Sequence, residues 1–186
     1  NAHLAKLGLV NRWEPRAARR LKFVEGLEAR HQVAITAANE HFTALLADWL
    51  LTHPTLFAKT EPRLRLLWQW HAAEEAEHKA TAFDLYLALG GTHEWRIRWF
   101  RRTTFFFLTD ALRQTVNNLH RDGQLWRWRT WRSAGRWLFG EHGIVSTTYA
   151  AWRQYFRPDF HPSQVSGDPS RRWLTENAQA DSIVGG

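Results

Sequence analysis

Residues 70–78 read Trp70-His71-Ala72-Ala73-Glu74-Glu75-Ala76-Glu77-His78. At about 100° per residue of an α-helix, four of these side chains fall within about 100° of one another: His71, Glu74, Glu75 and His78. Trp68, Ala82 and Leu85 lie on nearly the same face, so we expect this face to point into the protein interior. A carboxylate and an imidazole three residues apart, as in Glu75 and His78, can reach the same metal ions, and di-metal sites in helical bundles use this spacing. The alternative is a charged helix surface, and the segment alone supports both equally.

The rest of the chain also predicts helices. Strand signals are scarce, because there is no sustained alternation of apolar and polar residues. Prolines, glycines and candidate caps divide the chain into helical segments at about 15–53, 60–90, 94–122, 125–139 and 144–156. We therefore expect an all-α bundle of four to five helices over residues 1–162, followed by a flexible C-terminal tail at 163–186.

The composition limits the chemistry. The 186 residues include no Cys, which excludes disulfides, thiolate metal sites and a cysteine nucleophile, so His, Asp and Glu must bind any metal. No apolar run is long enough to span a membrane, and no secretory signal peptide opens the chain. Phosphate loops, dinucleotide fingerprints and the Gly-x-Ser-x-Gly motif are absent as well.

Glu40 is the best candidate for a carboxylate from a second helix. Small and apolar residues flank it within about 60°: Val33, Thr36, Ala37, Ala44, Ala47 and Leu51. A carboxylate in such a stripe is costly unless it is paired or binds metal. The opposite side of this helix is also apolar, so we expect the helix to be buried all round. His41, about 100° away, is expected to lie beside the ligands or to be a satisfied buried histidine.

Glu28 and His31 repeat the carboxylate–imidazole spacing. If the helix is continuous, His31 lies about 180° from Glu40 and about 13 Å along the axis. His31 and Glu40 therefore cannot bind the same metal centre, and we favour Glu40 as the ligand.

Three motifs with their joint spacing resemble the bacterial family of predicted metal-dependent hydrolases. They are Asn39-Glu40-His41-Phe42-Thr43-Ala44, then residues 70–79 with Phe83-Asp84, and finally Arg157-Pro158-Asp159-Phe160-His161-Pro162. The resemblance covers about residues 1–162 and implies a ferritin-like bundle with a binuclear metal site. By that pattern Glu40 is the lone carboxylate ligand of one helix, and Glu75 and His78 are the Glu-x-x-His ligands of another. From their places on the two helices we expect His41 and His71 to lie beside these ligands. The implied cofactors are two divalent ions of iron, manganese or zinc, and His161 is expected to fix a turn rather than to line the site.

The chain also departs from the family pattern. It lacks the family's earlier Gly-Glu step and its Gln-Glu-x-x-His-x-x-x-His helix, and it begins with Asn1 and has no Met. We therefore expect it to start just after the first two metal-bearing helices of the family. Such a fragment holds about half of the ligands, so weak metal binding and low activity are expected.

The resemblance predicts a cytoplasmic hydrolase that acts on an unidentified small molecule. A divalent metal lowers the pKa of bound water, and Glu74 is the candidate general base. Carboxylate-rich sites with two His in a helical bundle are equally typical of di-iron or di-manganese oxidases and oxygenases, so this alternative stays open.

Residues 94–137 carry ten Arg, no Lys, three acidic residues and six of the 12 Trp, and they account for the whole net charge of +7. Three interpretations follow, in decreasing order of weight. The Trp side chains pack on the bundle while Arg faces water; the segment is a peripheral contact with an anionic membrane; or it binds nucleic acid. The second interpretation gives a further alternative, a non-catalytic helical module that docks on membranes.

Overall fold

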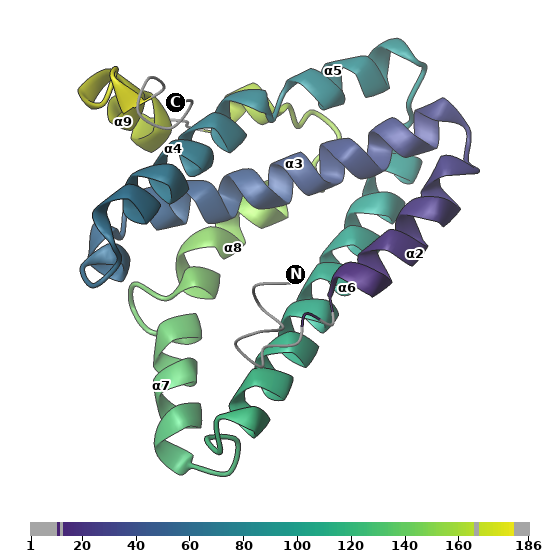
Figure 1. Cartoon of the computed structure of the whole chain (residues 1–186). Helices are drawn as coiled ribbons and strands as arrows, with labels where there is room; N and C mark the ends of the chain where they lie inside the picture. The colour runs from purple at the N-terminus through teal and green to yellow at the C-terminus, as the bar shows by residue number, and fades with distance from the viewer. Residues whose placement is uncertain (1–10, 12, 166–167, 181–186) are drawn as a thin grey trace.

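The computed structural model describes residues 11, 13–165 and 168–180, apart from the side chains of residues 76–78 (Figure 1). Its α-helices are α2 (Glu14–Glu25), α3 (Ala29–Leu51), α4 (Pro62–His78), α5 (Thr81–Ala88), α6 (His93–Arg121), α7 (Trp128–Phe139), α8 (Ile144–Gln154) and α9 (Asp168–Glu176). Two short 3-10 helices span Pro54–Phe57 and Pro162–Gln164. No strand occurs among the described residues, and the all-α prediction is confirmed.

Helix α3 is the centre of the fold. It contacts α4 and α5, which follow one another along its length, and it also contacts α2, α6, α8 and α9 (Figure 1). Its buried residues cover most of its circumference and include five alanines, which let the neighbouring helices approach closely. The prediction that this helix is buried all round is wrong on one side, where Thr36 and Asn39 are exposed.

Two predicted helical segments are each divided into two helices. The first ends at Glu25, because Gly26 follows and Glu28 adopts an extended backbone before α3. The second is interrupted at Lys79 and Ala80, between α4 and α5, although no glycine or proline marks this point. Lys79 is buried there, and its Nζ donates a hydrogen bond to the carbonyl of Val165 at 2.8 Å.

Helix α9 lies within the segment that the sequence predicts to be a flexible tail. It packs on α4 and α3, and the hydroxyl of Ser170 donates a hydrogen bond to Asp48 Oδ1 on α3 at 3.1 Å. Residues 168–176 are therefore ordered by tertiary contacts that proline and glycine content does not reveal. The domain boundary at residue 162 stays a prediction, and residues 181–186 lie outside the described part of the chain.

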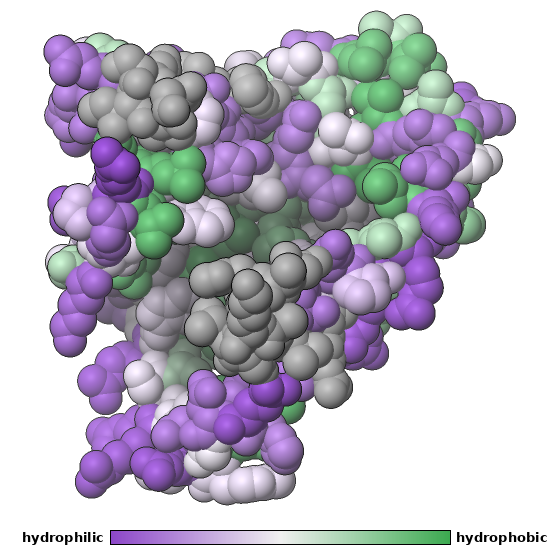
Figure 2. Space-filling model, viewed as in Figure 1, coloured by the Kyte–Doolittle hydropathy of each residue, from purple (hydrophilic) through white to green (hydrophobic). Residues whose placement is uncertain are grey.

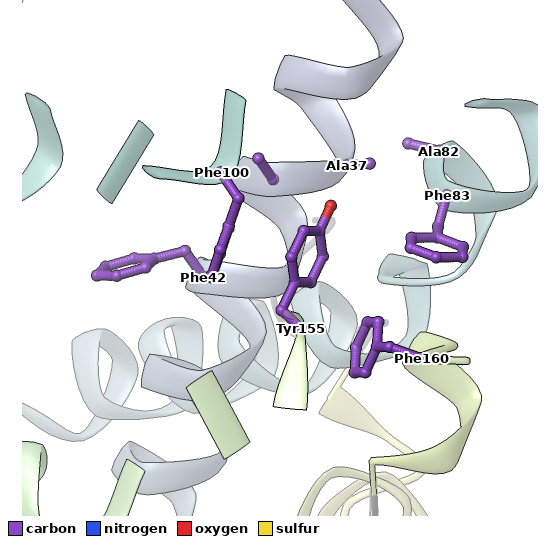
Figure 3. Packing of buried hydrophobic residues seen from close by; sticks show 8 residues of the cluster. Ala37, Phe42, Ala82, Phe83, Phe100, Tyr155 and Phe160 are labelled. Carbon is purple, nitrogen blue, oxygen red and sulfur yellow. The ribbon is translucent and has the colours of Figure 1, made fainter. Parts of the chain in front are cut away.

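The hydrophobic core is built from alanines and aromatic rings. Its main cluster joins α3, α5, α6 and the end of α8 (Figure 3) and consists of Ala37, Ala38, Phe42, Ala82, Phe83, Phe100, Tyr155 and Phe160. A second cluster places Tyr86 of α5 against Ala34 and Trp99. A Cβ on Gly91 would overlap the Tyr86 ring, so glycine is required just after α5.

A buried arginine holds α6 to the end of α8. Arg96 is 3% exposed, and its guanidinium donates hydrogen bonds to the carbonyls of Tyr155, Arg157 and Phe160. It also lies 5.2–5.8 Å from the ring centroids of Phe83, Tyr155 and Phe160. The carbonyl dipoles at the C-terminal end of α8 thus face its positive charge, where a helix favours a cation. Burial lowers the pKa of this guanidinium.

Helices α6 and α7 meet at a turn far from α4 and diverge from it as an open V, which we call the α6–α7 hairpin (Figure 1). Near the middle of α6, Arg16 and Arg20 of α2 form ion pairs with the buried carboxylate of Asp110. Helix α7 packs mainly on α8, and its Trp137 meets Trp49 of α3 edge to face at 5.5 Å. The space-filling view shows hydrophilic residues gathered over the hairpin end of the molecule (Figure 2).

Candidate metal centre

The contact between α3 and α4 brings a carboxylate of one helix against the other. Thr43 Oγ1 on α3 lies 2.9 Å from Glu75 Oε2 on α4 and donates a hydrogen bond to it. The second carboxylate oxygen, Glu75 Oε1, lies 3.7 Å from His71 Nε2, one turn earlier on α4. Glu75 is therefore half-buried and oriented from both helices.

Glu40 lies on the same side of α3 as Thr43, one turn earlier. Its Oε2 atom is buried. Burial raises the pKa of Tyr155, and the negative charge of Glu40 adds to this effect, which places the Glu40 carboxylate near the aromatic core. The structure thus puts Glu40 one turn from the residue that contacts Glu75.

His78 follows Glu75 by three residues in the last turn of α4. Its side chain lies outside the described residues, so its contact with Glu75 and Glu40 stays a prediction. No group of three or more His, Asp or Glu side chains that could hold a metal ion is gathered elsewhere in the described part of the chain or at this contact. The donors that are present, carboxylate oxygens and an imidazole nitrogen, are of the kinds that iron, manganese and zinc accept.

His41 lies in the aromatic core beside Glu40. Its ring centroid is 5.6 Å from that of Phe100, 4.7 Å from that of Tyr155 and 5.2 Å from that of Phe160. Burial, with the positive charge of Lys79, lowers the pKa of His41 to about 3. A hydrogen bond with the backbone of Ala151 opposes this shift, but burial outweighs it. His41 is therefore a neutral group at pH 7.

The face of α4 that carries His71 is more open than the sequence predicts. Trp68 is 53% exposed and Leu85 is 50% exposed, whereas Ala82 is buried. The prediction of an interior face is wrong for these two large residues. Trp68 is exposed because α4 buries the side that carries Ala72 and Ala73. Leu85 lies on α5, and the break between α4 and α5 means that it does not continue the face of α4. The half-buried Glu74 on α4 forms no hydrogen bond or ion pair with another described residue, and its role as a base stays a prediction.

The second Glu-x-x-His pair has a structural role. Glu28 precedes α3 in an extended conformation and forms an ion pair with Arg30 at 3.0 Å. His31 Nδ1 accepts a hydrogen bond from the indole Nε1 of Trp99 at 3.1 Å, and its ring contacts that of Trp95. The His31 imidazole on α3 thus holds α6 in place through these two Trp side chains.

Asp84 and His161 connect two of the sequence motifs. His161 Nε2 lies 2.7 Å from Asp84 Oδ1. Its Nδ1 accepts a hydrogen bond from the backbone N–H of Ser163, so His161 caps the 3-10 helix Pro162–Gln164. The imidazole also contacts the ring of Phe83 edge to face at 5.1 Å. Sequence reasoning places His161 in a turn but does not predict its partner, because 77 residues separate the two side chains.

Replacing Asp84 with Asn is expected to lower the free energy of unfolding by about 0.5–1 kcal/mol, because the pair is partly exposed. Urea unfolding of Asp84→Asn, His161→Gln and the double variant measures the coupling between the two side chains. A coupling energy of zero would show that the contact contributes nothing. Glu141→Gln, which removes an exposed carboxylate with no ion pair among the described residues, is the control.

The fold and the site together define an all-α protein with carboxylate and imidazole groups where two helices meet. The chain belongs to the family of predicted metal-dependent hydrolases, whose model matches residues 1–166. This match confirms the resemblance that the three motifs indicate. No curated protein and no solved structure matches the chain. Of the described helices, none combines the length and the hydropathy needed to cross a bilayer.

Proposed function

We propose that this protein is a hydrolase in which Glu40, Glu75 and His78 bind divalent metal ions where α3 meets α4. The observation that carries the proposal is the hydrogen bond from Thr43 to Glu75, which turns one candidate ligand toward the helix that bears the other. Membership of the metal-dependent hydrolase family supports the same activity. In this proposal the bundle is ferritin-like and holds two ions.

Each residue has a distinct role in this proposal. A divalent ion held by Glu40, Glu75 and His78 would supply Lewis acidity and lower the pKa of a water molecule. Thr43 fixes the rotamer of Glu75, and His71 lies beside the second oxygen of the same carboxylate. Glu74 accepts the proton of the attacking water.

His41 would keep the core side of Glu40 apolar. Because it is neutral and lies among aromatic rings, it does not compete with a cation for the carboxylate. The low dielectric on this side strengthens the attraction between Glu40 and a cation.

Removing one carboxylate is expected to weaken metal binding at least about 10-fold, because even residues that only orient a ligand have effects of this size. Chelator-stripped protein is titrated with Mn²⁺, Zn²⁺ and, without oxygen, Fe²⁺, and the variants Glu40→Gln and Glu75→Gln are compared with Glu94→Gln, an exposed control on α6. Glu74→Gln should keep the metal affinity and lose turnover of ester substrates. Equal affinities for all variants would overturn the assignment of the ligands.

The metal that binds separates the hydrolase from the redox alternative. Zinc or manganese with ester hydrolysis supports the proposal. Iron with an oxygen-dependent absorption band and no hydrolysis would replace it with an oxidase or oxygenase.

A further inference from the structure

Aromatic side chains are unusually exposed in the turn between α6 and α7 and at both ends of α7. Trp126 is 90% exposed, Trp128 is 74% exposed and Phe139 is 65% exposed. Large aromatic residues normally bury most of their area, so a group with this exposure indicates a binding surface. We call this group, together with the exposed side chains of Arg127, Arg129, Arg132 and Arg136, the hairpin surface.

The hairpin surface lies on the outward side of α7. At about 100° per residue, five of its members fall within about 100° of one another: Trp128, Phe139, Arg132, Arg136 and Arg129. The other side of α7 faces the protein, where Trp137 contacts Trp49 and where Ala134 and Leu138 are half-buried. Packing on the bundle therefore does not account for the outward aromatic residues.

The charge of the hairpin is not compensated within it. Residues 112–139 contain six Arg and one acidic residue, Asp122. None of the four Arg of the hairpin surface forms an ion pair with another described residue. The surface therefore presents an unbalanced positive charge to any partner.

The first half of α6 provides an internal comparison. Arg98 lies 4.4 Å from the ring centroid of Trp95, and Arg102 lies 4.9 Å from that of Trp99. Trp99 is buried, so Trp packing and Arg stacking explain this part of the basic segment. Neither kind of contact is seen for the Arg of the hairpin surface among the described residues.

The tip of the hairpin is fixed in shape. The indole Nε1 of Trp131 donates a hydrogen bond to the carbonyl of Leu125 at 2.7 Å, which ties the turn to the first helical turns of α7. Gly123 has a φ of 63°, the left-handed conformation that lets the chain reverse after α6. Trp126 is thus presented by an ordered turn.

We propose that the hairpin surface docks the protein on anionic phospholipid membranes. Tryptophan rings prefer the headgroup level of a bilayer, and arginine binds lipid phosphates, so one helix face that carries both fits this interface. Aromatic residues at both ends of the face, with Arg between them, allow α7 to lie flat on the headgroups. The contact is peripheral and does not depend on the proposed hydrolase activity.

Vesicle flotation of the full chain tests the proposal. With phosphatidylcholine vesicles that contain phosphatidylserine, we expect binding at low salt that weakens at high salt, and weak binding to pure phosphatidylcholine. The triple variant Arg129→Gln, Arg132→Gln, Arg136→Gln is expected to lose affinity about 100-fold, from the usual contribution of each basic residue at an anionic surface. The double variant Trp126→Ala, Trp128→Ala should lose affinity at either salt concentration.

Matched controls remove the same groups elsewhere on the surface. Trp68→Ala removes an exposed Trp of α4, and a triple change to Gln at Arg63, Arg65 and Arg153 removes three exposed charges. These controls should bind vesicles nearly as well as the parent. Equal losses in both triple variants would overturn the proposal, as would equal binding to neutral vesicles.

A second probe separates a membrane from a nucleic acid. A single-stranded oligonucleotide is added in place of vesicles, because bases also stack on exposed Trp. Binding that requires Trp126 and Trp128, together with no flotation, would make the hairpin surface a nucleic-acid site and overturn the membrane proposal. Circular dichroism confirms that each variant retains its helices.

Discussion

Replacing Arg96 with methionine is expected to lower the free energy of unfolding by about 3 kcal/mol. The buried guanidinium donates hydrogen bonds to the carbonyls of Tyr155, Arg157 and Phe160. Methionine has no donor, so all three carbonyls lose this hydrogen bond. The loss also removes the contact of the cation with three aromatic rings. Urea unfolding, followed by circular dichroism at two protein concentrations, measures the change.

Two further variants distinguish the proposed cause from a general loss of charge. Arg98→Met removes an exposed Arg of the same helix and is expected to change stability by no more than about 1 kcal/mol, because only its stacking on Trp95 is lost. Arg96→Lys keeps the charge but lacks the planar fork of donors, so it should recover part of the loss. A full recovery with Lys would show that charge alone matters at this position, and equal effects of Arg96→Met and Arg98→Met would contradict the role given to the carbonyls.

The metal-free protein is expected to lose stability in acid because of His41. Its pKa is lowered to about 3 in the folded state by burial and by the Lys79 and Arg96 charges, with an ordinary value near 6.5 in the unfolded chain. As the pH falls, the unfolded state therefore binds a proton on His41 before the folded state does. The free energy of unfolding keeps its full value, as far as His41 is concerned, above about pH 6.5 and decreases below it. Between pH 6 and pH 4 this group alone should cost about 2.5 kcal/mol.

The comparison with His41→Phe isolates this contribution, since other acid-sensitive groups are common to both proteins. Unfolding is measured from pH 7 to pH 4 in the presence of a chelator. The variant is expected to show a smaller slope of stability against pH, whereas His120→Gln, at an exposed position on α6, should keep the parental slope. Identical slopes for parent and His41→Phe would mean that the pKa of His41 is the same in the folded and unfolded states.

Local signals predict most of the helices. Thr92 accepts a hydrogen bond from the backbone N–H of Trp95 and starts α6, and Gly123 follows its end, so both limits are visible in the sequence. The break at Lys79 and the order of α9 could not be predicted in this way. Both depend on partners far along the chain, Val165 for Lys79 and Asp48 for Ser170.

The candidate site could be predicted only in part, because spacing along one helix is visible in the sequence and packing between helices is not. Helical spacing places Glu40 and Thr43 on one side of α3, and the structure brings Glu75 to that side. Spacing cannot show which face of α4 is covered, because coverage depends on how neighbouring helices pack, and Trp68 is consequently exposed. Arg96 was missed altogether, since nothing in its sequence neighbours shows that backbone carbonyls of a distant turn surround it.

The central position of α3 has a mechanical consequence. Helix α3 touches six other α-helices, whereas α7 rests mainly on α8. Local opening costs least where few contacts are lost, so α7 can detach while the remaining bundle stays closed, and α3 cannot open without the whole bundle. We therefore expect the backbone amides of α7 to exchange with solvent before those of α3.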